Sequence, residues 1–258
     1  TYKGFFASAN PSSGAGISVS KDKAIGPQGG SSDLILFNPV VPDNEWSHVV
    51  LQRSKGVHSL YRNGVLQGTS ATAIDFSNTT LRLASRYADN TNRMFGGHIH
   101  DFRVSKGLAR YPYIAKPKTL TQTNSGMEKP DAEFPTVSSA SNTLFLSCHA
   151  STIVDGSSNT VSVTANGNAA VSSFHPRAGD AGMKSVSFDG TGDYLSATTA
   201  SALSADDWTI EYWVWHNNLS ANQIHLAFGA YTPAFYYRYA SAKFAMYQTS
   251  ASFGTNYW

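Results

Sequence analysis

The sequence predicts an all-β protein built as antiparallel sandwiches, and three observations carry this prediction. Short apolar or alternating runs recur with turn residues between them, for example at positions 81–83, 99–104 and 209–214. Such alternation is typical of strands with one face on a core and the other in water. No apolar pattern with helical spacing extends beyond two turns. Because one open sheet cannot cover both of its faces, a chain of 258 residues with this pattern requires stacked sheets.

The clearest register signal lies in residues 43–68. Residues 47–53 and 57–62 are rich in β-formers and roughly alternate. The pair Asn63-Gly64 follows them, and Asn-Gly is the strongest two-residue hairpin signal because a type I′ turn needs positive φ at both central positions. We therefore expect two strands joined by a loop, followed by a hairpin into a third strand.

Composition excludes several classes of function. The net charge is +2 and 14% of residues are charged, which is too balanced for a nucleic-acid-binding surface. No stretch approaches the roughly 20 apolar residues of a membrane helix, so we expect no membrane insertion. The single cysteine, Cys148, cannot form an intrachain disulfide, and its apolar neighbours indicate a small buried side chain.

An internal repeat indicates that the chain holds two incomplete copies of one module. Trp46 precedes the first hairpin, and Trp258 stands at the corresponding place in the second series of strands. Residues 112–142 contain several prolines and few alternating apolar residues, which indicates a linker or arm. We expect the C-terminal part of a first sandwich in 1–111, this arm, and the N-terminal part of a second sandwich in 143–258.

Half a sandwich leaves an open apolar face and unpaired strand edges. Three arrangements follow. If these residues are the whole chain, the two halves can meet as one circularly permuted domain. Alternatively, another chain completes each half. The simplest interpretation is that the sequence is a fragment of a longer multi-module protein. The start at Thr1 rather than Met favours a processed, trimmed or partial chain.

Several motifs carry a resemblance to a known family. They are WxHVxLxR at 46–53, LYxNG at 60–64, GxIxDFRVSKGxARY at 97–111, SFDGxGDYL at 187–195 and WTIExWV at 208–214. These runs resemble laminin-G-like modules of the concanavalin A-like lectin/glucanase superfamily. The resemblance implies concanavalin A-like jelly-roll sandwiches. The low-charge version rich in Ser, Thr and Asn, which leads into a proline-bearing arm, resembles modules of bacteriophage tail, fibre and decoration proteins.

The resemblance implies a non-enzymatic, lectin-like structural and adhesion module in a virion or extracellular setting. Expected partners are other copies of the chain, neighbouring virion proteins and surface glycans, with no nucleic acid. Two alternatives stay open: a carbohydrate-binding domain of a glycan-active enzyme, and a cellular surface adhesin.

No catalytic residue is predicted. Glucanases of this superfamily need two carboxylates flanking the glycosidic bond, and Glu211 is the only acidic residue in its strand. No cofactor is expected, although a structural calcium ion is compatible with the oxygen ligands of Asp101, Asp155, Asp189 and Asp193. His98 and His100 share a strand face that could chelate a transition metal. The competing interpretation is that the aspartates stabilise turns and the histidines lie on a solvated face.

Two clusters are candidates for glycan contact, because sugars stack on aromatic rings and hydrogen-bond to polar loops. One is the loop bearing Tyr87, Asp89 and Asn90, and the other is the run Tyr236, Tyr237 and Arg238. Core packing and protein–protein contact are the competing interpretation of the second cluster. In strand 209–215 we expect Ile210 and its alternate residues to face the core, leaving Glu211 and two tryptophans on the opposite face.

Overall fold

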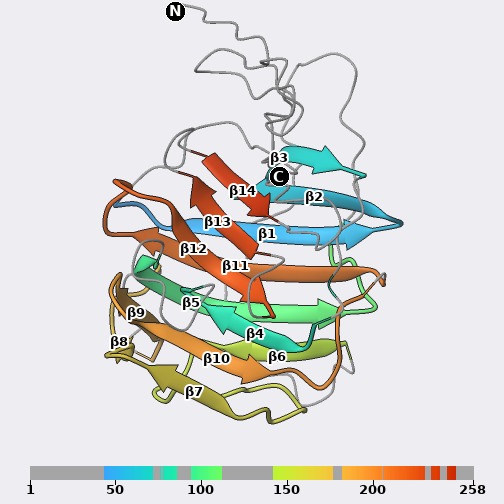
Figure 1. The fold of residues 1–258 in the computed structure, drawn as a ribbon. Coiled ribbons are helices and arrows are strands. Elements are labelled where there is room, and N and C mark those ends of the chain that lie inside the picture. The colour runs from blue at the N-terminus through green and yellow to red at the C-terminus, as the bar shows by residue number, and fades with distance from the viewer. Residues whose placement is uncertain are drawn as a thin grey trace, which may run out of the picture.

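The protein is an all-β sandwich of two antiparallel sheets (Figure 1). The computed structural model describes residues 44–71, 76, 78–85, 94–111, 142–176, 182–204, 206–229, 234–238 and 243–247. Within these ranges there is no helix, and hence none with the length and apolarity needed to cross a membrane. Every pair of named neighbouring strands is antiparallel, which confirms the predicted fold class.

The two sheets differ in size. The larger has eight strands in the order β3 (Val65–Ser70), β2 (Val57–Arg62), β1 (Ser47–Ser54), β11 (Trp208–His216), β5 (Gly96–Lys106), β9 (Ser185–Asp189) and β8 (Ala170–Ser172), with β6 (Thr143–Ser147) also paired to β5. The smaller has six strands in the order β14 (Lys243–Tyr247), β13 (Ala234–Arg238), β12 (Gln223–Phe228), β4 (Thr80–Leu83), β10 (Tyr194–Thr198) and β7 (Val163–Asn166).

Strands from both halves of the chain alternate in each sheet. In the larger sheet β11 lies between β1 and β5, and in the smaller sheet β4 lies between β12 and β10. The described strands of the two halves therefore belong to the same two sheets. The division into partial modules at 1–111 and 143–258 stays a prediction. The identity of 112–142 as an arm between modules stays a prediction, because only Asn142 of that range is described.

The predicted hairpin is confirmed. Asn63 and Gly64 have φ of 47° and 81°, and Arg62 faces Val65 across the turn. The Asn63 side chain also accepts a hydrogen bond from the backbone of His48 at 2.8 Å, which ties the turn to β1. Because His48 N–H pairs with this side chain, the turn residue contributes to the sheet as well as to the hairpin.

The core lies between the sheets and draws apolar side chains from both. Val49, Leu60 and Val214 of the larger sheet pack with Leu83 and Phe228 of the smaller one. Burying such side chains is the main stabilising term in a sandwich. Residues 210, 212 and 214 all belong to this core, as predicted from the alternation of the strand.

A chain of polar side chains crosses this apolar core. The Tyr212 hydroxyl lies 2.9 Å from Nδ1 of His225, and Nε2 of His225 lies 2.9 Å from Nε2 of His216. Tyr212 and His216 come from β11 and His225 from β12, so these hydrogen bonds link the two sheets. All three side chains are fully buried, and rings such as Phe95 and Phe244 surround them. We call these three residues the core relay.

Burial keeps both histidines of the core relay neutral. It lowers the pKa of His216 to about 3. Burial and the neighbouring His216 also lower the pKa of His225 well below its ordinary value. In the unfolded chain these histidines have a pKa near 6.5. Below that pH the unfolded state therefore binds protons that the folded state does not bind.

This difference predicts acid-sensitive stability. The contribution of the core relay is fully present above pH 6.5, and it is lost as pH falls toward the folded pKa of His216, about 3. Each histidine lowers the free energy of unfolding by up to about 1.4 kcal/mol per pH unit in that window. Urea unfolding between pH 7.5 and 4.5 measures the slope. The double variant His216→Asn/His225→Gln should flatten it, whereas His175→Gln, at a half-buried site outside the core, should flatten it far less. Equal slopes in all three proteins would contradict the assignment.

Candidate binding face of the larger sheet

The outer face of the larger sheet is the face turned away from the core. Register across β11 sets its layout: Thr209 lies between Gln52 and Ser105, and Trp213 lies between His48 and His100. Most of these side chains are buried although they are outside the core. Trp213 and Trp215 both lie on this face with Glu211, as expected, but Trp213 is 1% exposed and only Trp215 is partly exposed.

A β-bulge in β5 brings its polar side chains onto this face. Glu211 pairs with Arg103, but the next outward residue of β11, Trp213, pairs with His100, so β5 carries one extra residue between these pairs. Asp101 takes up the irregularity with a φ of 52°. Because side chains alternate along a strand, His100 and His98 would otherwise face the core. The bulge therefore places both histidines on the same side as Arg103.

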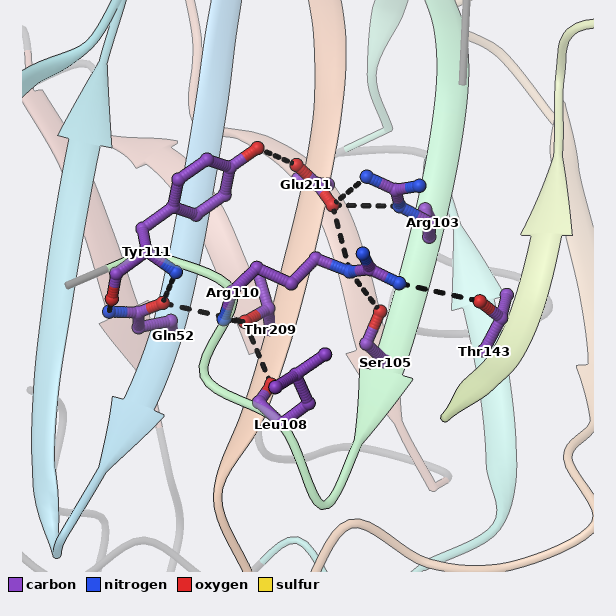
Figure 2. A network of polar contacts seen from close by, with 9 residues as sticks. All are labelled: Gln52, Arg103, Ser105, Leu108, Arg110, Tyr111, Thr143, Thr209 and Glu211. Carbon is purple, nitrogen blue, oxygen red and sulfur yellow. Dashed lines mark hydrogen bonds and ion pairs between the residues drawn. The ribbon is translucent and has the colours of Figure 1, made fainter. Parts of the chain in front are cut away.

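Glu211 is the centre of a buried ionic network (Figure 2). Its Oε1 accepts a hydrogen bond from Nε of Arg103 at 2.7 Å, and Nη2 of Arg103 lies 2.6 Å from the same oxygen. Arg110 contributes a second ion pair at 3.5 Å, and the Tyr111 hydroxyl donates to Oε2. Glu211 is fully buried, so its negative charge is offset by these neighbours rather than by water.

Residues 108–111, here called the covering segment, cover this network on the outer side of the sheet. The chain turns at Gly107, whose φ is 72°. Thr209 then donates from its hydroxyl to the Leu108 carbonyl at 3.1 Å and accepts from the Arg110 amide at 2.9 Å. These bonds give the second half of the motif GxIxDFRVSKGxARY a structural role (Figure 2).

Gln52 on β1 fixes the end of the covering segment. Its side chain donates to the Tyr111 carbonyl at 2.7 Å and accepts from the Tyr111 amide at 3.1 Å. Burial and the Glu211 carboxylate raise the pKa of the Tyr111 phenol well above its ordinary value, so it stays protonated and acts as a donor. Glu211 is thus a buried carboxylate whose oxygens are paired within the fold.

A second feature of the outer face is a cluster of four rings: Trp46, His98, Phe174 and Trp215. We call it the aromatic cluster. Phe174 lies 4.7 Å from Trp215 and 5.3 Å from Trp46 between ring centroids, and Trp46 lies 5.9 Å from Trp215. His98 lies 4.9 Å from Phe174. Four separate segments supply these rings: the residue before β1, strands β5 and β11, and the segment after β8.

The aromatic cluster is accessible, in contrast to the Glu211 network. Phe174 is 40% exposed, and the other three rings are partly exposed. Register holds two of them together, since Trp215 faces His98 directly. Ser185 holds a third, because its hydroxyl donates to the Phe174 carbonyl at 2.6 Å. The result is a partly exposed aromatic surface on an ordered sheet, which is a common feature of ligand sites.

The side chains predicted for glycan contact lie outside the part of the protein that the structure describes. Tyr87, Asp89 and Asn90 lie outside the described residues. Tyr236, Tyr237 and Arg238 form part of β13, which pairs with β12 and β14. The structure describes their backbone but not their side chains. Both clusters therefore stay predictions.

Three of the four aspartates proposed as calcium ligands, Asp155, Asp189 and Asp193, accept hydrogen bonds from backbone amides, whereas Asp101 lies in β5 with Oδ2 3.4 Å from Nε2 of His100. Asp155 accepts from the amides of Leu146, Ser157 and Val161 at 2.9–3.0 Å. Asp193 accepts from two further amides. These bonds use the carboxylate oxygens for backbone donors, as the turn interpretation requires. No group of three or more His, Cys, Asp or Glu residues suited to a metal lies within the described ranges, and His98 packs in the aromatic cluster instead.

Comparison with known families supports the resemblance over part of the chain. Residues 5–109 match the Concanavalin A-like lectin/glucanases superfamily. The matching family model is a laminin-G type, and it covers less than half of the chain, including strands β1 to β5. No curated protein and no solved structure matches the chain. The strands beyond residue 109 complete the sandwich with those inside the match.

The Glu211 network predicts coupled losses of stability. Glu211→Gln should lower the free energy of unfolding by about 3–5 kcal/mol, because Arg103 stays buried without its counter-charge. Tyr111→Phe should cost about 1–3 kcal/mol. The double variant should cost less than the sum. Lys106→Gln removes an exposed ion pair with Asp206 and is the control, expected to cost at most about 1 kcal/mol. Strict additivity in chemical denaturation would contradict the network.

Two adjacent glycines predict a sharp difference in tolerance. A Cβ on Gly97 would lie 1.9 Å from the Trp215 carbonyl oxygen, whereas one on Gly96 would meet nothing closer than 3.4 Å. Gly97→Ala should therefore destabilise the protein by about 2–4 kcal/mol and disturb the aromatic cluster. Gly96→Ala should cost less than about 1 kcal/mol. Thermal melting and tryptophan fluorescence check both effects, and equal tolerance would show that β5 and β11 are not so close.

Proposed function

We propose that the protein is a non-enzymatic, lectin-like structural and adhesion module of a virion protein, and that it binds surface glycans at the aromatic cluster. The partly exposed rings on the outer face carry this proposal. The match of residues 5–109 to a lectin and glucanase superfamily supports carbohydrate as the ligand class. The proposed setting is the virion or another extracellular surface.

The ring geometry favours a sugar laid across the cluster. Sugars present apolar C–H faces that stack on aromatic rings, and hydroxyls that bond to polar groups at the edge. A cage for a quaternary ammonium group instead needs open space between rings. Here the closest centroids are 4.7–5.9 Å apart, so the rings pack against one another and leave no such space. The accessible surface is the outer side of Phe174 and its neighbours.

Binding without hydrolysis is proposed because of the state of Glu211. Glycoside hydrolysis uses a pair of carboxylates that reach the sugar. Glu211 is buried beneath the covering segment and is engaged by Arg103 and Tyr111. A carboxylate held in this way serves the fold. A carbohydrate-binding domain of a larger enzyme or a cellular adhesin would use the same aromatic surface, and the sequences flanking the module in the full gene distinguish these settings.

The virion setting and its partners rest on sequence character. The chain is rich in Ser, Thr and Asn, has few charges and leads into a proline-bearing stretch at 112–142, as in the phage modules that it resembles. We propose other copies of the chain and neighbouring virion proteins as assembly partners. Neither nucleic acid nor a membrane is proposed as a partner.

The proposal predicts glycan binding that depends on exposed rings. A glycan array followed by calorimetry should find ligands whose affinity falls at least about tenfold in Phe174→Ala and Trp215→Ala, as expected when a stacking contact is lost. Val154→Ala is the control, since Val154 is a similarly exposed apolar residue outside the cluster, at 44% exposure. No reducing sugar should be released. Unchanged affinity in both ring variants would place binding elsewhere, and loss of self-association alone would favour an assembly surface.

A further inference from the structure

We propose that His98 is the specificity-determining residue of the aromatic cluster. Its Nε2 atom accepts a hydrogen bond from a donor group of the sugar, and Ser185 holds the imidazole in the tautomer that makes this bond available. This inference rests on the proposed function and deepens it, because it names the kind of ligand group that the cluster selects.

Ser185 determines which nitrogen of His98 carries the proton. The Ser185 hydroxyl has one proton, and the 2.6 Å distance shows that this proton goes to the Phe174 carbonyl oxygen. A carbonyl can only accept, so the hydroxyl must be the donor there. Nδ1 of His98 lies 3.4 Å from the same hydroxyl oxygen. That oxygen can now only accept, so a hydrogen bond between these two atoms requires the proton on Nδ1.

A neutral imidazole with its proton on Nδ1 has a lone pair on Nε2. Among the described residues, this Nε2 has no hydrogen-bond partner, and the His98 side chain is partly exposed. Nε2 of His98 is not one of the buried polar atoms that lack a partner, whereas Nε1 of Trp46 is. The Nε2 atom is therefore open to solvent. An unused acceptor that water or a ligand can reach therefore lies at the edge of the aromatic cluster.

His98 is the acceptor of the aromatic cluster by elimination. The indole nitrogens of Trp46 and Trp215 can only donate, and Phe174 has no polar side-chain atom. A ligand stacked on these rings therefore meets one side-chain lone pair. It must offer a donor at that position, either a hydroxyl or the N–H of an acetamido group. A site built to bond such a donor discriminates strongly against analogues that lack it.

The tautomer also gives the site a pH dependence. Burial lowers the pKa of His98 below its ordinary 6.5, so the ring is neutral at pH 7. Titratable residues on the segments packed around it include His100, Asp101 and Arg103 on β5, Glu211 and His216 on β11, Glu45 before β1, His175 after Phe174, Lys184 before β9 and Asp189 in β9. Protonation of His98 replaces the Nε2 lone pair with an N–H donor. Affinity should therefore be constant above pH 6.5 and fall as pH drops below it.

The first experiment reads the tautomer directly and needs no ligand. Long-range ¹H–¹⁵N correlation spectra of the full chain distinguish an Nδ1–H ring from an Nε2–H ring. The wild type should show the Nδ1–H form at pH 7.5, and Ser185→Ala should shift the population toward Nε2–H. His175→Gln is the matched control on a neighbouring segment and should leave the His98 signals in the same tautomer. A predominant Nε2–H form in the wild type overturns the proposal.

The second experiment measures binding of methyl glycosides of glucose, galactose and N-acetylglucosamine, and of the tightest array ligand, between pH 8 and 5. His98→Phe keeps the ring but removes the acceptor, and should weaken binding at least about tenfold at pH 7.5. His98→Gln keeps an acceptor oxygen and should bind with no dependence on pH. Circular dichroism at each pH separates loss of affinity from loss of fold.

The outcomes separate this inference from the proposed function. If Phe174→Ala abolishes binding while His98→Phe binds as tightly as the wild type, the specificity role of His98 is wrong and the glycan site stands. Affinity of His98→Gln that still falls below pH 6.5, as in the wild type, also overturns the role. If no probe or array glycan binds, the proposed function fails, and the selecting role of His98 fails with it.

Discussion

Strand β11 is the element on which the rest of the structure depends, because it is hydrogen-bonded to β1 on one edge and to β5 on the other. Both partners come from the other half of the chain. The pleat of this one strand then assigns side chains to two environments. Tyr212 faces the core and joins the relay between the sheets, whereas Glu211 and Trp215 face outward. Core, ionic network and aromatic cluster therefore share one register, and a slip of one residue would exchange them.

The outer face shows how a buried charge is kept in a sheet that no further layer of described strands covers. Glu211 could be left in water at little cost, yet it is enclosed with Arg103 and the covering segment. Replacing such a network by apolar residues is often neutral or stabilising, so the network is weak evidence of added stability. Its clearer effect is geometric. It fixes where the chain leaves β5, because Gln52 and Thr209 hold the backbone of the covering segment at defined distances.

Local sequence patterns predicted the parts of this fold that depend on nearby residues. The turn at Asn63 and Gly64 and the inward face of β11 follow from turn chemistry and alternation. The aromatic cluster could not be predicted in the same way, because it needs pairing between strands more than 100 residues apart and a bulge at Asp101. Phe174 gave no signal at all, since it follows a short strand and reaches the cluster through one hydroxyl, that of Ser185.

Burial lowers the pKa of His98 and of the two core-relay histidines, but acid affects a different property through each set. His216 and His225 are completely enclosed, so the folded core resists their protonation and acid acts through the free energy of unfolding. His98 is partly exposed and can take up a proton while the sandwich stays intact. Protonation there changes an acceptor into a donor without moving the backbone. If His98 holds a ligand as proposed, acid acts on binding through this ring and on the free energy of unfolding through the core relay, so the two effects are separate.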